Sequence, residues 1–245
     1  MSELIKNRIL VWDLPTRWFH WLLALSFAGA WLTSESERYS DLHVMLGYTL
    51  LGLIAFRLVW GFAGSRHARF TDFAYSPAKI VQYLKSLVSG RPEHYLGHNP
   101  AGAVAVFLLL ALGLATGISG WLTYNEIGGE WFEDVHEFFA NSMLAVVGVH
   151  IAGVIVSSLL HRENLVRAMV TGYKQGGNEA AIGGKRALSA LLLVAAVAGF
   201  WGLWFNGNLD PLVTAQTSAQ TWEEHDYRGK DEYRERNNDR RDDHE

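Results

Sequence analysis

The chain has 245 residues and a formal net charge of −4, and 49% of its residues are hydrophobic. The small charge and the lack of a basic, aromatic-rich patch argue against a nucleic-acid-binding protein. The chain has no cysteine, which excludes disulfides, thiolate metal sites, iron–sulfur clusters and thioether-linked cofactors. The hydrophobic residues gather in long runs, and such runs are typical of a membrane protein.

Five apolar runs have the length of membrane spans. A hydrocarbon core of about 30 Å needs roughly 20 apolar residues in a helix. The predicted spans are residues 17–34, 42–62, 101–123, 132–160 and 187–205. We therefore predict an all-α fold, an integral membrane helical bundle. The first run lacks the pattern of a short apolar segment with a small-residue cleavage site, so we expect it to be retained as a span.

The basic residues predict an orientation in the membrane. Lys and Arg gather before the first span and after the second and fourth spans. The opposite connections, SESERYSD and YNEIGGEWFED, contain one Arg and no Lys. Because cytoplasmic connections carry the excess of Lys and Arg, we expect the N-terminus inside and the C-terminus outside. Many of the ten Trp residues fall near span ends, as an interfacial aromatic belt requires.

Two segments lie outside the predicted spans. Ser76 and Pro77 form a helix-start signal, and apolar residues then recur on one helical face as far as Gly90, which predicts a short interfacial helix. Residues 207–245 end in a stretch of mixed charge without apolar periodicity, so we expect a charged tail outside the membrane, disordered alone or docking a partner. Residues 1–206 form the predicted transmembrane domain.

Four of the ten histidines lie within the predicted spans: His20, His43, His136 and His150. An imidazole in hydrocarbon is costly unless it is hydrogen-bonded, paired or bound to a metal. A separation of 14 residues between His136 and His150 corresponds to about 21 Å of helix rise and to nearly the same face. Under the predicted orientation, His20 and His150 share the inner depth, and His43 and His136 share the outer depth.

Two histidine pairs at two depths favour two haems, each held between two axial imidazoles from facing helices. A single intramembrane histidine is more often an interhelical hydrogen-bonding residue, but four that pair by depth favour ligation. Zinc needs three or four ligands at one level. Because both axial positions of each iron are filled, the natural function is electron transfer. His67, His94, His225 and His244 lie in connections or in the tail and receive no assigned role.

The sequence also resembles a known family. The resemblance covers about residues 8–175, in the stretches VWDLPTRWFHWLLALSFAGAWLTSE, DLHVMLGYTLLGLIAFRLVWGFAGSRHARF, YLGHNPAGA and VHEFFANSMLAVVGVHIAGVIVSSLLHRENLVRAM. These resemble the bacterial diheme cytochrome b561 family, which includes the b-type cytochrome subunit of nickel–iron hydrogenases. The resemblance implies a four-helix haem-binding core plus a fifth span, in the bacterial inner membrane. It implies two haem b groups, ligated by His20 with His150 and by His43 with His136, and quinone or quinol as exchangeable substrate.

Three further polar residues are candidates for cofactor contacts. Arg57 lies 14 residues after His43, on about the same helix face. It is placed either to contact a haem propionate or quinone, or to reach the interface with its charged end. His98 and Asn99 precede the third span, where capping is one role and a polar edge for a quinone or propionate is the other.

Three functions remain open from the sequence. In the first, a cytochrome b of the respiratory chain transfers electrons between the quinone pool and a periplasmic partner, either a c-type cytochrome or a redox-enzyme subunit such as that of a hydrogenase. In the second, the chain is a self-sufficient superoxide:quinone oxidoreductase, which the acidic outer connections disfavour. In the third, it is a transporter or membrane anchor that contains no haem and uses its intramembrane histidines to relay protons or to bind helices.

Overall fold

Long helices dominate the computed structural model, which describes residues 7–90, 93–129 and 131–207. Five of them coincide with the predicted spans: α1 Leu14–Thr33, α2 Ser40–Ala63, α4 Pro100–Tyr124, α5 Trp131–His161 and α7 Ala187–Phe205. The all-α prediction is confirmed. The predicted tail, apart from its first residue, lies outside the described residues.

Four helical segments are long and apolar enough to cross a membrane, counted over the described ranges. These are Glu37–Ala63, which adds the short 3-10 helix η1 (Glu37–Tyr39) to α2, together with α4, α5 and α7. Helix α1 is absent from this set although it has 20 residues, because Arg17, His20 and three Trp residues lower its mean hydropathy. Its membrane-spanning role stays a prediction.

Side-chain caps fix where several helices begin. Asp13 accepts a hydrogen bond from the backbone N–H of Thr16 (2.9 Å) at the start of α1. Ser76 caps the short helix α3 (Pro77–Val88) in the same way. Each of these helices has proline in its first turn, where the missing N–H costs nothing. The predicted short helix is thereby confirmed, while its place at the membrane interface stays a prediction.

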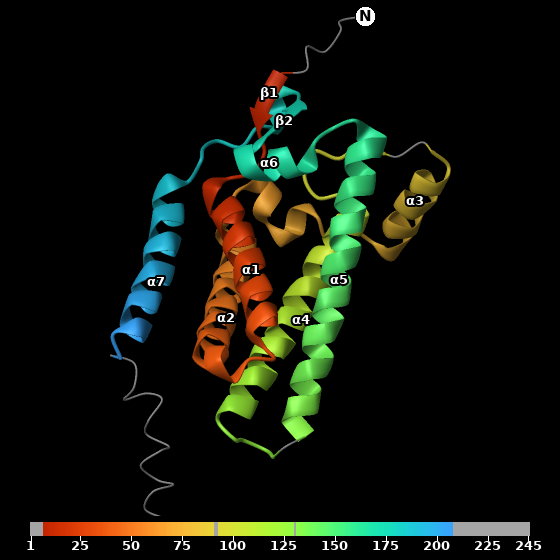
Figure 1. Ribbon diagram of the computed structural model, residues 1–245. Coiled ribbons are helices and arrows are strands. Elements are labelled where there is room, and N and C mark those ends of the chain that lie inside the picture. Colours follow the sequence, from red (N-terminus) through yellow and green to blue (C-terminus); the bar gives the residue numbers. More distant parts are fainter. Residues whose placement is uncertain (1–6, 91–92, 130, 208–245) are drawn as a thin grey trace, which may run out of the picture. The chain divides into compact units, whose positions relative to one another are not determined.

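The helix core lies between α1, α2, α4 and α5. Helix α1 packs along α2, α4 packs along α5, and α2 also contacts α4 (Figure 1). The apolar centre of this packing contains Phe19, Phe27, Leu50, Leu53, Ile54, Leu110 and Met143, and Leu193 of α7 joins it. At Gly117 a Cβ atom would stand 2.3 Å from the side chain of Leu51, so glycine permits the close approach of α2 and α4.

A small sheet and several short helices close one end of the bundle. Strand β1 (Asn7–Leu10) pairs antiparallel with β2 (Tyr173–Gly176), with Asn7 opposite Gly176. The short helices are α6 (Leu165–Thr171), η2 (Arg66–Ala68), η3 (Phe70–Asp72) and η4 (Asn178–Ala180). The sheet was not predicted, because four-residue strands are too short to show a period.

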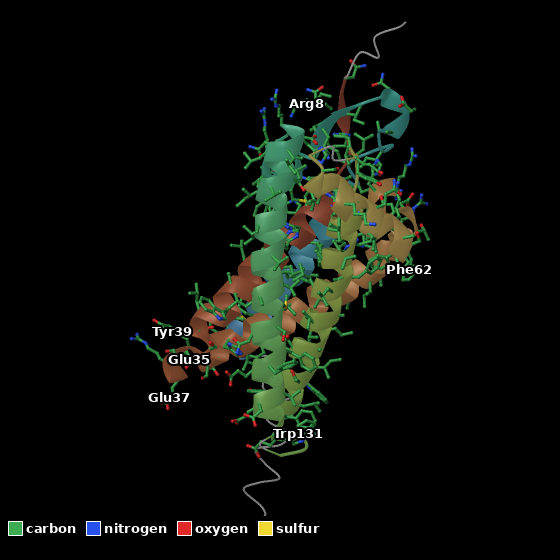
Figure 2. The ribbon with its side chains drawn as sticks, turned by 90° about the vertical axis from the view of Figure 1, so that its right-hand side faces the viewer. Arg8, Glu35, Glu37, Tyr39, Phe62 and Trp131 are labelled. Carbon is green, nitrogen blue, oxygen red and sulfur yellow. The ribbon has the colours of Figure 1, made fainter. Side chains whose placement is uncertain are left out.

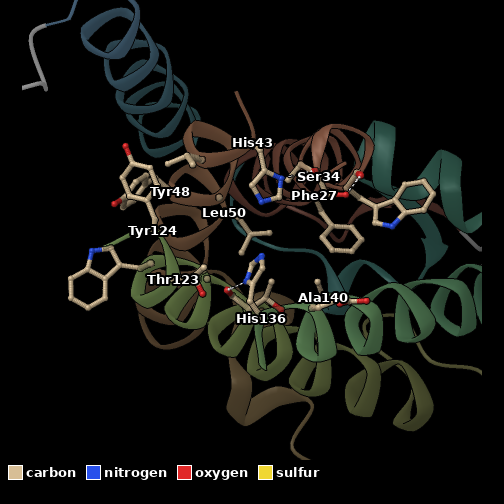
Figure 3. Close-up of a pocket in the computed structure, with 18 of the residues that line it drawn as sticks. Phe27, Ser34, His43, Tyr48, Leu50, Thr123, Tyr124, His136 and Ala140 are labelled. Carbon is tan, nitrogen blue, oxygen red and sulfur yellow. Dashed lines mark hydrogen bonds between the residues drawn. The ribbon is translucent and has the colours of Figure 1, made fainter. Parts of the chain in front are cut away.

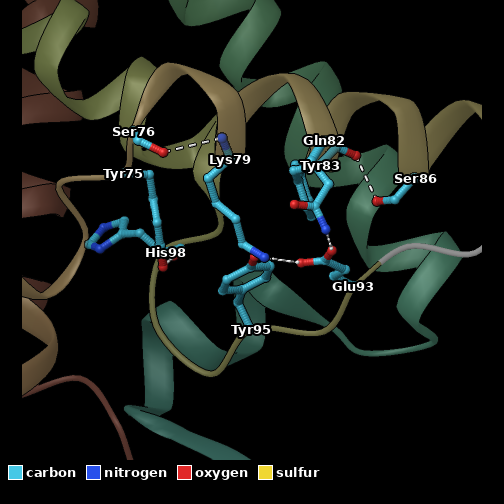
Figure 4. Close-up of polar contacts among 9 residues, drawn as sticks. All are labelled: Tyr75, Ser76, Lys79, Gln82, Tyr83, Ser86, Glu93, Tyr95 and His98. Atoms are coloured by element: carbon cyan, nitrogen blue, oxygen red, sulfur yellow. Dashed lines mark hydrogen bonds and ion pairs between the residues drawn. The ribbon is translucent and has the colours of Figure 1, made fainter.

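The connection after α3 is tied back to that helix by polar contacts (Figure 4). Glu93 accepts hydrogen bonds from Lys79 (2.9 Å), Gln82 (2.7 Å) and the hydroxyl of Tyr95 (2.7 Å). The bonds from Tyr95 and Lys79 lower the pKa of Glu93, so it stays ionised. This arrangement fixes the segment that leads into His98 and α4.

Charge is distributed unevenly between the two ends of the bundle. Glu35, Glu37 and Trp131 lie at one end, and Arg8 lies at the other (Figure 2). We call these the acidic end and the basic end. Both ends belong to the first of two compact units, Met1–Ala198, and the second unit, Gly199–Glu245, includes the last turns of α7. The basic end is the one that the sequence predicts to face the cytoplasm.

Candidate functional site

The four histidines that lie within the predicted spans form two facing pairs. His43 of α2 and His136 of α5 lie with ring centroids 6.1 Å apart and ring planes at 85° (Figure 3). His20 of α1 and His150 of α5 lie with centroids 6.5 Å apart and planes at 55°. We call His43 with His136 the acidic-end pair, and His20 with His150 the basic-end pair. The structure thus brings together the same partners that the sequence paired by depth.

Backbone carbonyls orient both rings of the acidic-end pair. Nδ1 of His43 lies 2.8 Å from the carbonyl oxygen of Ala30, and Nδ1 of His136 lies 3.0 Å from that of Thr116. A carbonyl can only accept, so each Nδ1 carries the hydrogen and each Nε2 keeps a lone pair. This is the tautomer that a metal-binding histidine needs. In the basic-end pair, Nδ1 of His20 is buried and has no hydrogen-bond partner within the described residues.

A cavity of about 410 Å³ surrounds the acidic-end pair. Phe27 and Leu50 lie beside the two rings (Figure 3). Gly47, Gly117 and Gly120, which have no side chain, also line the cavity. A Cβ atom at Gly120 would stand only 2.8 Å from the ring of His136. The glycines therefore leave open space around the two rings, and a flat, bulky cofactor needs such space.

The spacing of the rings fits one metal atom between each pair. A metal–nitrogen bond to an imidazole is about 2 Å long, and the nitrogen lies about 1 Å from the centre of its ring. Two imidazoles on opposite sides of one metal atom therefore have ring centres about 6 Å apart. The centroid distances of 6.1 and 6.5 Å agree with this spacing. Within the described ranges, no three His, Cys, Asp or Glu side chains gather in a metal-binding group. Two ligands at each level fit haem iron, whose porphyrin supplies the other four nitrogens.

Arg57 is buried in an aromatic environment. It is only 2% exposed, and its guanidinium lies over the rings of Phe70 (4.7 Å) and Phe73 (5.9 Å). Its Nη1 atom has no hydrogen-bond partner among the residues described. Arg57 therefore does not extend to solvent, and its charge is available to a buried acceptor.

His98 also contacts Phe73. Its ring contacts Phe73 (4.3 Å between centroids) and Trp12 (4.8 Å), and its Nδ1 is buried without a partner in the described part of the chain. Burial, and then the nearby charge of Arg57, lower the pKa of His98 to about 3, so its imidazole is neutral. Arg57 and His98 are thus two polar groups that lie against the same aromatic ring.

Asn99, in contrast, has a structural role. Its side chain accepts a hydrogen bond from the backbone N–H of Gly102 (2.7 Å) and caps α4. This is the capping alternative that the sequence left open. Its second proposed role, as a polar edge for a quinone or propionate, stays a prediction.

Sequence reasoning missed the residues that hold the histidines in place. Thr116 orients His136 through its backbone carbonyl, and the hydroxyl of Ser119 lies 3.3 Å from the same Nδ1. Gly120 makes room for the ring one residue later. Four of the five residues from Thr116 to Gly120 are small, and this concentration of small residues inside an apolar span was the available signal.

Half-buried imidazoles that face each other in pairs between long apolar helices are the ligand arrangement of a membrane cytochrome of the b type. Residues 11–172 match the family described as prokaryotic cytochrome b561. This chain belongs to that family, which confirms the resemblance drawn from the sequence. It is accordingly a bacterial membrane protein of electron transfer that uses haem b.

Curated relatives agree with this assignment. The chain is 25% identical over 222 residues to the "Probable Ni/Fe-hydrogenase B-type cytochrome subunit" of Rhodobacter capsulatus, covering 70% of this chain and 84% of the relative. The protein of the same name from Azotobacter vinelandii is 25% identical over 217 residues, covering 69% and 89%. That from Cupriavidus necator is 25% identical over 210 residues, covering 67% and 86%. No solved structure matches the chain.

Proposed function

We propose that the protein is a diheme cytochrome b that transfers electrons between the membrane quinone pool and a periplasmic redox partner. The observation that supports two haems is the presence of two facing imidazole pairs, both with one member on α5 and 14 residues apart. The names of the relatives support a redox-enzyme subunit, such as a hydrogenase, as the partner. A periplasmic c-type cytochrome is the other partner that this function admits.

In this proposal each residue has a defined task. His20 with His150, and His43 with His136, hold the two haems, and α5 sets their separation at about 21 Å of helix rise. When bound, haem iron with two axial imidazoles supplies one-electron transfer. Ala30 and Thr116 keep Nε2 of the acidic-end imidazoles available, because their carbonyls bind the other ring nitrogen. The apolar helices around both pairs exclude water from the ligands.

Arg57 and His98 are proposed to recognise polar groups near the basic-end pair. Arg57 offers a buried positive charge to a propionate carboxylate or a quinone oxygen. His98 offers Nδ1 for a hydrogen bond beside it. The basic end is proposed to face the cytoplasm and the acidic end the periplasm, because the exposed basic residues gather at the former.

Two other functions have less support. Superoxide is an anion, and the cavity at the acidic-end pair is lined by Glu35, Glu133 and Glu137, whose carboxylates repel it. A transporter or anchor that contains no haem does not agree with membership of a cytochrome family. Quinone-linked electron transfer is the function that the charges and the ligand pairs favour together.

A haem count on single histidine variants tests the proposal. We expect the pyridine-haemochrome assay to give two b haems in the purified protein and one in His43→Ala or in His150→Ala, each with a different low-spin signal missing. His94→Ala, at an exposed position, is the matched control and retains both. Quinol added to the oxidised protein should reduce the haems. One haem in the native protein, or unchanged spectra in both variants, would falsify the diheme arrangement; a failure of quinol alone would exclude the quinone link.

A further inference from the structure

A second cavity, of about 470 Å³, lies at the basic end, where the segment after α2 meets the segment before α7. Ser65, Arg66 and Arg69 line it from the first segment. Gly183, Gly184 and Arg186 line it from the second. Three arginines from two remote parts of the chain therefore surround one open space, and neither the histidine pairs nor Arg57 takes part in it.

The positive charge of this cavity is only partly balanced. Arg69 pairs with Asp72 at 3.1 Å. Arg66 donates a hydrogen bond to a neutral acceptor, the backbone carbonyl of Glu179 (3.2 Å), and makes no ion pair with a described residue. Arg186 has neither an ion pair nor a hydrogen bond from its side chain within the described ranges. Two guanidinium groups thus remain for an anion, and guanidinium binds phosphate oxygens in a bidentate manner.

Ser65 gives a second, independent indication of a ligand. The residue is 7% exposed, it lines the cavity, and its Oγ is buried without a hydrogen-bond partner in the described chain. A buried hydroxyl normally finds a partner, because leaving it unpaired costs free energy. An anionic oxygen bound among the arginines would accept the hydrogen bond from this hydroxyl.

The position of the cavity identifies the source of the anion. It adjoins the end of α2 and the start of α7, both of which are candidate membrane spans. Phe62, in the last turn of α2, is 74% exposed and projects outward (Figure 2), and Leu188, in the first turn of α7, is 69% exposed. Exposed apolar side chains in the helix turns that adjoin the arginines match a phospholipid, with acyl chains along the helices and phosphate at their ends.

We propose that this cavity binds the phosphate group of an anionic phospholipid at the cytoplasmic surface of the membrane. Arg66 and Arg186 contact the phosphate oxygens, and Ser65 donates a hydrogen bond to one of them. The lipid joins the end of α2 to the start of α7. Free inorganic phosphate has the same chemistry, so the test separates the two sources.

The test is native mass spectrometry of the full-length, haem-loaded protein in detergent. It is titrated with dioleoyl phosphatidylglycerol, with phosphatidylcholine of the same chains, and with inorganic phosphate. The pocket variant is Arg66→Gln with Arg186→Gln. The matched control is Arg162→Gln with Arg167→Gln, two exposed arginines that lie outside the cavity. Ser65→Ala provides a milder change, which preserves the fold if the double variant does not assemble.

We expect phosphatidylglycerol to bind more tightly than phosphatidylcholine, and millimolar phosphate not to displace it. Loss of two arginines near the headgroup should weaken phosphatidylglycerol binding by about 30-fold. Ser65→Ala should weaken it by a smaller factor, and the control should match the native protein. Equal binding in the pocket variant and the control would overturn the proposal. Binding of inorganic phosphate in preference to the lipid would overturn the lipid as its ligand.

Discussion

Gly120 of α4 faces His136, and the distance leaves no room for a methyl group. A Cβ atom at this position would stand 2.8 Å from Cε1 and 2.9 Å from Nδ1 of the imidazole. In Gly120→Ala the ring must move by a good fraction of an ångström. That movement breaks its contacts with the carbonyl of Thr116 (3.0 Å) and the hydroxyl of Ser119 (3.3 Å). His136 then loses the orientation that directs Nε2 toward its partner His43.

The net effect on folding is small, whereas the effect on ligation is large. Overpacking costs about 1–3 kcal/mol. Alanine recovers about 1 kcal/mol of helix propensity relative to glycine. We therefore expect Gly120→Ala to fold, with a free energy of unfolding lower by roughly 0–2 kcal/mol. Haem at the acidic-end pair is weakened or lost, while haem at the basic-end pair is retained.

The matched control is Gly52→Ala on α2, where an added Cβ meets no atom within 4 Å. The assay is a pyridine-haemochrome count together with the low-spin optical and electron paramagnetic resonance spectra. Gly52→Ala should keep two haems with native spectra, and Gly120→Ala should lose the signal that His43→Ala also removes. Two haems with unchanged spectra and potentials in Gly120→Ala would refute the ligand role of His136.

Two other predictions concern the buried polar groups. Replacing Arg57 with Gln should lower the midpoint potential of the haem that we propose at the basic-end pair by on the order of tens of millivolts, because a nearby buried cation favours the reduced iron. Optical redox titration measures this potential, and Arg57→Lys is the charge-preserving control. An unchanged potential, or an equal shift in both haems, would contradict this placement. Folding lowers the pKa of His98 from 6.5 to about 3. Between these two values the imidazole is protonated in the unfolded chain and neutral in the folded one, so the stability of the fold falls as the pH drops from about 6.5 toward 3. His98→Gln has no group that titrates in this range, so at pH 5.5 it should avoid a loss in the free energy of unfolding on the order of 1 kcal/mol. Thermal melts of the native protein and of His98→Gln at pH 7.5 and 5.5 measure this difference. An equal drop in melting temperature in the two proteins would contradict the prediction.

The long helices and the pairing of the histidines follow from local rules. Apolar runs of span length fix α2, α4, α5 and α7, and a separation of 14 residues sets two levels on any straight helix. The histidine partners then follow from depth alone. No knowledge of the side-chain packing is needed for that step.

The environment of Arg57 required the folded structure. Its aromatic neighbours, Phe70 and Phe73, come from the short 3-10 helix η3 and the residue after it. No periodic pattern places that segment against the end of α2. The sequence left Arg57 equally suited to the interface and to a cofactor, because it shows spacing along one helix but not what covers it.

Lys174 shows where counting charges fails. The sequence groups it with the basic residues that are predicted to face the cytoplasm, but its side chain is 3% exposed and lies 3.1 Å from the carboxylate of Glu163. Its ammonium also donates to the backbone carbonyl of Tyr95 (3.2 Å). Lys174 lies on β2, whose partner strand β1 leads directly into α1. Burial of this residue depends on a strand pairing between segments more than a hundred residues apart.

This placement predicts an effect of Lys174 on the basic-end haem. Gly172, just before β2, accepts hydrogen bonds from the N–H groups of Val11 and Trp12, which precede the helix that bears His20. Lys174→Met leaves Glu163 with a poorer partner, and since Glu163 is partly exposed we expect a loss of about 1–3 kcal/mol. The double variant Lys174→Met with Glu163→Gln should regain part of this lost stability, because it no longer holds the Glu163 carboxylate without its Lys174 partner. In the low-spin optical and electron paramagnetic resonance spectra of Lys174→Met, the signal assigned to the His20–His150 pair should broaden. The signal assigned to the His43–His136 pair should stay unchanged. Equal disturbance of both signals would mean that Lys174 supports the whole bundle instead of the start of α1.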